Sequence, residues 1–519
     1  MEITAKKNKR NPQYNIRWIT FAIVSSILAI SSWAVSSPIG SSPDDDFHLP
    51  SIWCGQGLRE GLCQEDIVDG WYQIPYTTMG NSACFAFDKD ASGDCDYDNS
   101  LAGQSHLNLA TPLYPPVYYW VMSWMASPDI PLSTISMRIM NGVFTVLTIV
   151  LLLIALPKNH RRAPLLTLIL TSVPLVIFLI GSTNPSAWSY LGLLTLLTAF
   201  SGFLSTQERK TRIILGLMSA FGFVMAVGSR ADATAFAGLA IVLAWILSGT
   251  VSRRLASNTL LTISLVGVIG VISLGNTGGA LSVISGTGLQ LPEVGRPEPQ
   301  LFGNLTRLPD LWAGVFGTWG LGWLDTPMPA IVWFSTLGVC LAIVFLSVST
   351  FKLRQTIAFI TSAVALTLIP MYILTTNGLS VGEQVQPRYL LPLIIFVVFT
   401  ALYRSKGDPG FSLSLGQLCL TGAALSIANS VALHTNLKRY LTGLDVRGIN
   451  LDAGIEWWWD GSPVSPNFVF IVGASSFALF LFSIWKLRQA IGLTDYLTNT
   501  QQKISLQPKE LKHGTKARQ

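Results

Sequence analysis

Residues 17–48 read RWITFAIVSSILAISSWAVSSPIGSSPDDDFH and combine the two features that decide the fold. The apolar run 18–36 is long enough to cross the hydrocarbon core of a bilayer. The basic residues that precede it are Lys6, Lys7, Lys9, Arg10 and Arg17. Because a basic flank stays in the cytoplasm, Asp44, Asp45 and Asp46 are expected to emerge on the opposite face of the membrane. Carboxylates crowded there are costly unless they bind a cation, share protons or accept a proton from a substrate. This stretch therefore suggests an enzyme that works at the outer membrane surface.

The composition indicates a polytopic membrane protein. Hydrophobic residues make up 50% of the chain, charged residues only 12%, and the mean hydropathy is +0.47. The net charge of +6 conceals a segregation of charge, since residues 39–133 hold thirteen acidic residues against Arg59 and Lys89. Basic residues instead occupy short loops between apolar runs, as in cytoplasmic loops and unlike a nucleic-acid-binding surface. No nucleic-acid partner is expected.

Apolar runs and basic loops alternate along the chain. The expected membrane spans are 18–36, 134–156, 164–181, 187–204, 212–228, 233–250, 256–275, 329–350, 355–375, 388–403, 411–433 and 467–486. Twelve spans with both termini inside place every basic loop in the cytoplasm. The sequence thus predicts an all-α polytopic protein with about twelve transmembrane helices.

This interpretation divides the chain into three parts. They are a basic cytoplasmic N-terminus (1–17), a transmembrane domain (18–486) and a basic cytoplasmic tail (487–519). Three stretches within the domain are too long for simple turns and are predicted to be extracytoplasmic: 37–133, 276–328 and 434–466. In the first of them, residues 113–126 are dense in aromatic residues and proline. That composition predicts an amphipathic helix on the outer membrane surface.

Four of the six cysteines lie in the first of these loops: Cys54, Cys63, Cys84 and Cys95. Four cysteines in an oxidising compartment predict two disulfides, for which three connectivities are possible. A zinc site is the alternative, but the spacings lack the close Cys-x-x-Cys pair that such sites commonly use.

The acidic cluster and His48 are the main candidates for catalysis. Asp44 or Asp45 could act as a general base, with a second carboxylate and the imidazole to orient it or balance its charge. Alternatively, the cluster could be an exposed acidic cap on the following helix, favoured by the helix dipole. The same side chains could ligate a divalent cation, so metal dependence stays open.

Three arginines on the predicted outer side are candidates for binding phosphate. Arg138 lies near the outer end of the second span, Arg230 between the fifth and sixth spans, and Arg388 at the outer start of the tenth. Arginines at that depth are costly unless they meet carboxylates or phosphates. They could bind a phosphate headgroup, anchor helices at the interface, or form internal salt bridges. The phosphate interpretation is strongest for Arg388.

Four motifs resemble those of a bacterial family of predicted membrane proteins, the domain of unknown function 2142 family. Pro43-Asp44-Asp45-x-x-His48 resembles the Pro-Asp-Glu-x-x-His stretch that opens the family's first extracytoplasmic loop. Residues 184–186 (NPS) resemble its Asn-Pro-Ser motif, and residues 321–327 (LGWLDTP) and 386–392 (QPRYLLP) resemble its later signatures.

That family is grouped with the GT-C superfamily of integral-membrane glycosyltransferases, which use polyprenyl-phosphate sugars and carry an acidic catalytic residue in the first outer loop. The resemblance implies a GT-C-like fold, with Asp44 or Asp45 as the base and Arg388 as a contact of the lipid phosphate. Asn184 and Asp325 lie in the matching motifs and are expected at the substrate site.

The implied activity is inverting transfer of a hexosyl or pentosyl group from a polyprenyl-phosphate donor to a cell-envelope glycan or lipid acceptor. It would take place among membrane lipids, on the extracytoplasmic face of a bacterial plasma membrane. No Walker motif or Gly-rich βαβ turn is visible, and such a donor needs neither because its leaving group is already activated. Two other classes remain open: a multipass transporter and a non-catalytic scaffold of polysaccharide assembly or export.

Overall fold

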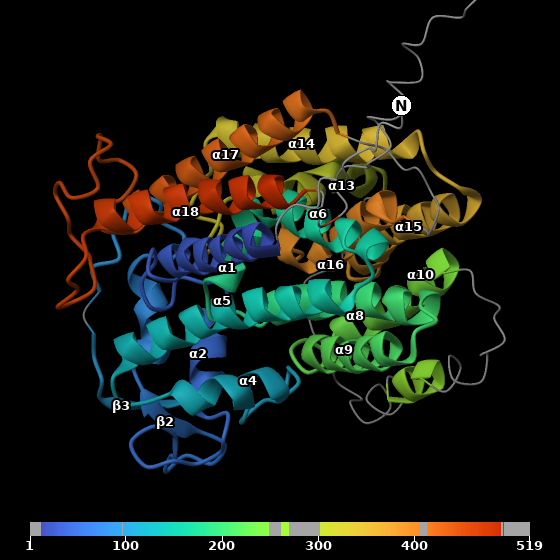
Figure 1. The fold of residues 1–519 in the computed structure, drawn as a ribbon. Helices are drawn as coiled ribbons and strands as arrows, with labels where there is room; N and C mark the ends of the chain where they lie inside the picture. The colour runs from blue at the N-terminus through green and yellow to red at the C-terminus, as the bar shows by residue number, and fades with distance from the viewer. Residues whose placement is uncertain are drawn as a thin grey trace, which may run out of the picture.

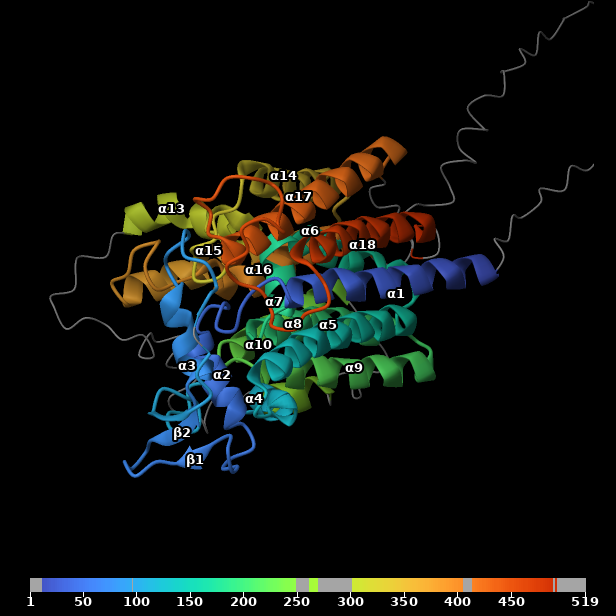
Figure 2. The ribbon, with the colours of Figure 1, turned by 90° about the vertical axis from the view of Figure 1, so that its left-hand side faces the viewer.

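The chain folds mostly into helices, which account for 67% of the computed structural model. The structure describes residues 12–95, 97–248, 261–268, 301–404, 413–488 and 491. Long helices lie side by side in a bundle, and a small sheet with short helices lies at one end of it (Figures 1 and 2). We call this end of the bundle the loop end. The opposite end, which carries Lys158, Arg161, Arg209 and Lys210, is called the basic end.

Nine helices within the described residues are long and apolar enough to cross a membrane. They are α1 (Pro12–Ala34), α5 (Ile130–Ala155), the broken helix Lys158–Ile180, α8 (Ser186–Ser205), α9 (Arg209–Val227), α14 (Ala330–Val348), α15 (Leu353–Thr376), α17 (Leu415–Leu441) and α18 (Pro466–Leu487). Two apolar helices are shorter: α10 (Ala233–Ser248) and α16 (Pro387–Leu402). These eleven coincide with eleven of the predicted spans. The remaining span, 256–275, is described only at residues 261–268, which are helical. A mostly helical chain with several candidate membrane spans is confirmed, with the addition of one small sheet, and the total of about twelve spans stays a prediction.

The broken helix consists of η3 (Lys158–His160), α6 (Arg162–Thr171), the π-helical turn η4 (Ser172–Val176) and α7 (Ile177–Ile180). Its break falls at Val173, whose backbone is extended (φ −103°, ψ 135°). Pro174 follows it, and a proline removes one helical N–H donor and disfavours helical backbone in the residue before it.

Helix α8 lies at the centre of the bundle. Every residue from Ser186 to Leu204 is buried, as expected for a helix that is hydrophobic all round. It packs closely on α9 because Gly192 and Gly222 face the partner backbone. A Cβ at Gly192 would lie 2.6 Å from the Ala226 nitrogen, and one at Gly222 would lie 2.7 Å from the Leu196 nitrogen. Small residues at such crossings let membrane helices approach closely.

Residues 37–116, the larger part of the predicted first loop, fold into a compact unit at the loop end (Figure 2). Its elements are α2 (Asp45–Trp53), β1 (Gln64–Glu65), β2 (Tyr72–Pro75), α3 (Thr77–Gly80), η1 (Asn81–Cys84) and β3 (Leu101–Gln104). The strands form an antiparallel sheet in the order β1-β2-β3, with Tyr72 opposite both Glu65 and Gln104.

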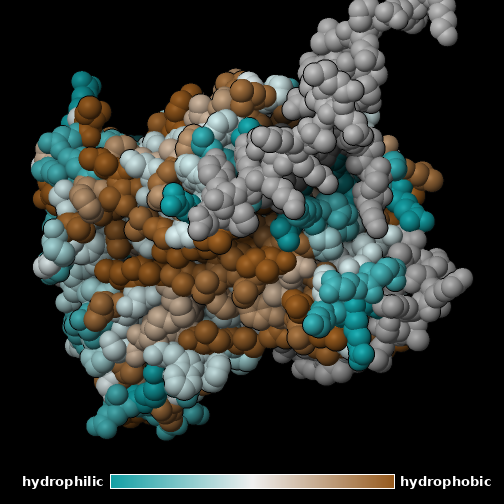
Figure 3. All heavy atoms as spheres, viewed as in Figure 1, coloured by the Kyte–Doolittle hydropathy of each residue, from teal (hydrophilic) through white to brown (hydrophobic). Residues whose placement is uncertain are grey.

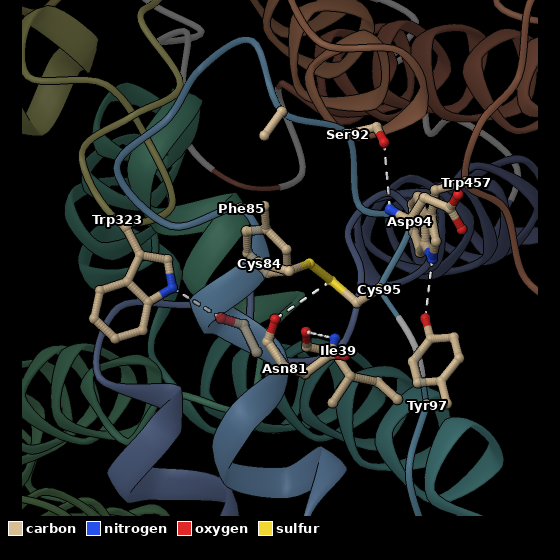
Figure 4. Close-up of a disulfide and its surroundings, with 12 residues drawn as sticks. Ile39, Asn81, Cys84, Phe85, Ser92, Asp94, Cys95, Tyr97, Trp323 and Trp457 are labelled. Atoms are coloured by element: carbon tan, nitrogen blue, oxygen red, sulfur yellow. Dashed lines mark hydrogen bonds between the residues drawn. A yellow bond between two sulfur atoms is a disulfide. The ribbon is translucent and has the colours of Figure 1, made fainter.

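Two disulfides cross-link this unit, as predicted. The pairs are Cys54–Cys63 and Cys84–Cys95, so each bridge closes a short local loop. In Figure 4 the second bridge lies beside Asn81, whose Nδ2 donates a 2.7 Å hydrogen bond to the Ile39 carbonyl. Nearby, Trp457 donates from Nε1 to the Tyr97 hydroxyl at 3.0 Å. The bridge thus lies near the place where this unit contacts Trp457.

The aromatic stretch 113–126 forms α4 (Val117–Met122) and the 3-10 turn η2 (Ser123–Met125). Tyr118 and Tyr119 are buried, whereas Trp120 and Trp124 are 50% and 67% exposed. The helix thus has one face packed on the protein and one aromatic face directed outward, which is the predicted amphipathic character. Its position at the outer membrane surface stays a prediction.

The other two long loops also contain ordered structure. The described part of 276–328 forms α13 (Leu301–Ala313) and the π-helical turn η5 (Gly314–Thr318). Helix α17 continues to Leu441, past the predicted end of its span at 433. Within this extension Arg439 is fully buried, with carbonyl and carboxylate partners, so the last turns of the helix pack inside the protein.

Candidate functional site

Five corners of the chain meet at the loop end around Asp44. They are the turn before α2, the segment that enters α4, the start of α8, the corner between α9 and α10, and the start of α16. Two contacts show how the corners are joined: the Asn184 Nδ2 donates to the Pro43 carbonyl at 2.9 Å, and the Tyr118 amide donates to the Gly228 carbonyl at 3.1 Å. Residues that are far apart in sequence therefore face one another in a single cluster.

Asp44 is the most accessible carboxylate at the centre of this cluster. Its backbone is left-handed (φ 60°, ψ 24°), a conformation that few residues other than glycine adopt but that aspartate tolerates better than most. This turn directs the side chain toward Arg388, whose Nη2 donates to Asp44 Oδ2 at 2.5 Å. The Asp44 side chain remains 35% exposed, so other molecules can reach it.

The charge of Asp44 is stabilised by its neighbours. Burial opposes ionisation, but Arg388, His48 and Arg230 together outweigh it and lower the Asp44 pKa. At neutral pH the stabilising charges are those of the two arginines, because burial lowers the pKa of His48 to about 3 and leaves its imidazole neutral. Asp44 is therefore a carboxylate at neutral pH.

Asp45 lies in a different environment, although it adjoins Asp44 in sequence. Its side chain is completely buried, and its two oxygens accept hydrogen bonds from the Ser42 amide and the Thr183 hydroxyl, both at 3.0 Å. Burial raises the pKa of Asp45 to about 7, even though Arg138 opposes this. Asp45 and Asn184 thus tie the turn before α2 to the start of α8.

Arg388 occupies the first turn of α16 and its side chain is only 3% exposed. Besides Asp44, its Nη2 contacts the Tyr389 hydroxyl at 3.1 Å. Its Nε and Nη1 are buried and have no hydrogen-bond partner among the described residues. Gly314 allows this start of α16 to sit close to η5, because a Cβ there would overlap the Pro387 ring. The Arg388 guanidinium is therefore buried, and its Nε and Nη1 are available as hydrogen-bond donors.

Arg230 is largely committed to Asp232. Its Nε and Nη2 each donate to a different oxygen of that carboxylate at 2.9 Å, and its Nη1 donates to the Ser186 hydroxyl at 3.3 Å. The guanidinium also lies over the Tyr389 ring, 4.9 Å from its centroid, and Arg388 lies 5.1 Å from the same centroid. Tyr389 is thus in cation–π contact with both arginines, which restricts how Arg388 can turn.

His48 and the neighbouring tyrosines form the wall behind Asp44. The His48 Nδ1 and the Tyr119 hydroxyl are 2.9 Å apart, and the Tyr114 ring meets the imidazole edge to face at 5.1 Å. Because the imidazole is buried and neutral, it serves to position these rings.

Two predicted residues lie outside this cluster. Arg138 is buried, and it donates to the Ala34, Ser37 and Pro38 carbonyls and to the Ser41 hydroxyl, so it holds the chain that leaves α1. Asp325 pairs with Arg439 at 3.0 Å and also accepts from the Phe87 amide at 3.1 Å. Both residues have partners within the protein, and their substrate contacts stay predictions.

The three carboxylates of the acidic cluster face different partners. Asp44 faces Arg388, Asp45 faces Ser42 and Thr183, and Asp46 lies 3.9 Å from the His106 Nε2. Across the part of the chain that the structure describes, no three His, Cys, Asp or Glu side chains are grouped to hold a metal ion.

Tyr389, Tyr114, Asp232 and Ser186 belong to the cluster but were not among the site residues predicted from the sequence. Tyr389 follows Arg388, Asp232 lies two residues after Arg230, Ser186 ends the motif NPS, and Tyr114 lies in the aromatic stretch 113–126. For Tyr389 and Asp232, the pairing of an arginine with an aromatic or acidic neighbour at a predicted outer corner is the pattern that could have identified them.

The five corners that form the Asp44 cluster all lie within the part of the chain that matches one protein family. Residues 27–397 match the model of the DUF2142 family, described as predicted membrane proteins, and the chain belongs to this family. The matched region includes Asp44, Arg230 and Arg388. Among curated proteins and among solved structures, the chain has no match.

Proposed function

We propose that the protein is a GT-C-type glycosyltransferase. In this proposal it transfers a sugar from a polyprenyl-phosphate donor to a cell-envelope glycan or lipid acceptor, at the loop end and on the extracytoplasmic side of a bacterial plasma membrane. Asp44 is the general base and Arg388 binds the donor phosphate.

The observation that carries this proposal is the geometry of Arg388. Its guanidinium is buried, its Nη2 contacts Asp44, and its Nε and Nη1 have no partner among the described residues. A buried guanidinium with two nitrogens that lack hydrogen-bond partners is costly, and phosphate oxygens satisfy such donors by charge-assisted hydrogen bonds. The N-terminus of α16, on which Arg388 stands, adds a partial positive charge that also favours an anion.

The position and charge of Asp44 fit a role as general base toward an acceptor hydroxyl. Asp44 is ionised and partly exposed, so it can take the hydroxyl proton as the acceptor oxygen attacks the anomeric carbon. The new bond joins that carbon to the acceptor oxygen, and the bond from the carbon to the phosphate oxygen breaks. Its electron pair leaves with the polyprenyl phosphate, where Arg388 stabilises the charge. The attack comes from the face opposite the phosphate, which inverts the anomeric centre.

Asp44 is preferred to Asp45 as the base for two reasons. Both oxygens of Asp45 already accept hydrogen bonds inside the protein, and the side chain is completely buried. A general base must come within hydrogen-bond reach of the proton that it removes, which Asp45 could do only after the turn opened.

The test compares cell-envelope glycans by mass spectrometry in strains that lack the gene and carry one variant each. Asp44→Asn should fail to restore the missing glycan, since loss of a positioned base costs about two to four orders of magnitude in rate. Asp46→Asn is the matched control, because Asp46 lies next in the chain but pairs with His106 away from Arg388. Restoration by Asp44→Asn would refute the assignment of the base and favour the scaffold alternative.

A second measurement tests the phosphate contact directly. Titration of purified protein with farnesyl phosphate, a short polyprenyl-phosphate probe, should show weaker binding for Arg388→Lys and weaker still for Arg388→Ala. Lysine keeps the charge but loses the planar arrangement of donors. Unchanged affinity in both variants would remove Arg388 from the site.

A further inference from the structure

A second possible binding place lies in the bundle, away from the Asp44 cluster. It is a cavity of about 300 Å³ between α1, α5, the broken helix and α18. Its lining on α1 extends from Ile19 to Ile30, which at about 1.5 Å per residue is about 16 Å along the helix. That length is about half of the ~30 Å hydrocarbon core and so matches one leaflet of a bilayer.

The lining is almost entirely hydrocarbon. Ala29, Ile149, Leu165 and Phe480 are typical of it, and Figure 3 shows hydrophobic side chains exposed along this part of the bundle. Water gains little in such a space because it needs several polar partners, whereas an apolar ligand fits it. In a membrane the available apolar ligand is a lipid chain.

One end of the cavity carries a charge. Arg161 lines the cavity at the basic end of the bundle, where its Nε donates to the Leu156 carbonyl at 2.8 Å and its Nη2 to the Ile154 carbonyl at 3.4 Å. These bonds hold the guanidinium at the junction of α5 and the broken helix, and the side chain remains partly exposed. Lys158, which is exposed, lies in the same loop. An anionic headgroup thus complements the charge at the end where an acyl chain would emerge.

The opposite end of the cavity is closed toward Asp44. Gly181 packs against Trp33, since a Cβ there would lie 3.0 Å from the Trp33 Cβ, and Trp33 is buried. Beyond it, Arg138 holds the chain that leaves α1. A molecule in the cavity therefore approaches from the basic end or from the side of the bundle.

We propose that this cavity binds one acyl chain of a phospholipid from the leaflet at the basic end, with its phosphate at Arg161. The site is separate from the proposed transferase site, and the bound lipid fills the space between α1 and the helices beside it.

The test is native mass spectrometry of full-length protein purified in a mild detergent. Wild-type protein should retain about one phospholipid per chain. Ser26→Phe places a ring in the cavity and should lower retention roughly tenfold. Leu28→Phe is the matched control, because Leu28 is exposed on the same helix outside the cavity, and it should retain the lipid.

The headgroup contact is tested by a second pair of variants. Arg161→Gln should lower retention of anionic phospholipid roughly tenfold, as expected for loss of a charge-assisted hydrogen bond, whereas Arg209→Gln, exposed at the same end of the bundle but outside the cavity lining, should change it much less. This pair keeps the proposal testable if Ser26→Phe does not fold. No retained phospholipid in the wild type, equal retention in all variants, or retention of a polyprenyl lipid alone would overturn the proposal.

Discussion

Replacing Asp45 with asparagine should remove a pH dependence of stability that the wild-type protein shows. Burial raises the Asp45 pKa from its ordinary value of 3.8 to about 7 in the folded protein. A carboxyl whose pKa is raised by folding contributes stability below its unfolded pKa and loses that contribution as the pH rises through the folded value. The wild-type protein should therefore lose stability between about pH 4 and pH 7.

The size of the effect follows from the two pKa values. Their difference corresponds to about 4 kcal/mol, of which about 2 to 3 kcal/mol falls between pH 5 and pH 8. Asparagine imitates the protonated acid: its oxygen can accept from the Ser42 amide, and its NH₂ can donate to the Thr183 hydroxyl, which can turn to accept. The variant should accordingly be the more stable protein at pH 8, by several degrees in melting temperature.

The assay compares melting temperatures of the wild type and Asp45→Asn in one detergent from pH 5 to pH 8.5. His48 titrates in the opposite sense, because burial lowers its pKa to about 3 and folding is favoured above its ordinary value of 6.5. Since His48 is present in both proteins, its contribution cancels in the difference between them. Parallel curves would refute the reasoning and would mean that Asp45 is already ionised at pH 5, with Arg138 as its counter-charge.

Three further predictions concern other parts of the loop end. Tyr389→Phe keeps the ring between the two arginines and should retain most farnesyl phosphate binding, whereas Tyr389→Leu should lower it several-fold, and equal affinities would exclude a positioning role. Asp325→Asn leaves the buried Arg439 without its carboxylate and should destabilise the protein by about 3 to 5 kcal/mol, read as a lower melting temperature than the wild type. Cys63→Ser opens the disulfide that closes a short loop with Cys54 and should cost about 2 to 3 kcal/mol, so an unchanged melting temperature without reductant would contradict its stabilising role.

The membrane helices could be predicted because the bilayer leaves the backbone few choices. Inside hydrocarbon every N–H and C=O must be paired within the segment, so an apolar run of sufficient length forms a helix whatever its neighbours are. The boundaries were less predictable. Helix α17 extends to Leu441, and its last turns include Arg439, which donates to oxygens on distant segments such as the Phe85 carbonyl. The sequence around Arg439 does not indicate these partners, so the end of the helix could not be predicted from it.

The candidate site was predicted in part. Asp44, His48, Arg230 and Arg388 were chosen for their residue types and expected depth, and they do meet in one cluster. Tyr389 and Asp232 were missed, since an aromatic ring or an acid beside an arginine gains a role only from its spatial neighbours.

The class of protein, eleven of the helical spans and the presence of two disulfides could be predicted from length, hydropathy and cysteine content, because these are properties of short stretches of the chain. The tertiary structure alone distinguished residues of the same type. Asp44 and Asp45 are adjacent in sequence, yet Asp44 accepts a hydrogen bond from Arg388, whereas Asp45 is buried and accepts hydrogen bonds from Ser42 and Thr183. Arg138 and Arg388 have similar expected depths, yet both terminal nitrogens of Arg138 donate to oxygens of the chain that leaves α1, and only its Nε has no partner among the described residues. In Arg388 both Nε and Nη1 have none. The charge, burial and availability of a side chain depend on segments that lie far away in the chain, and only folding brings these segments together.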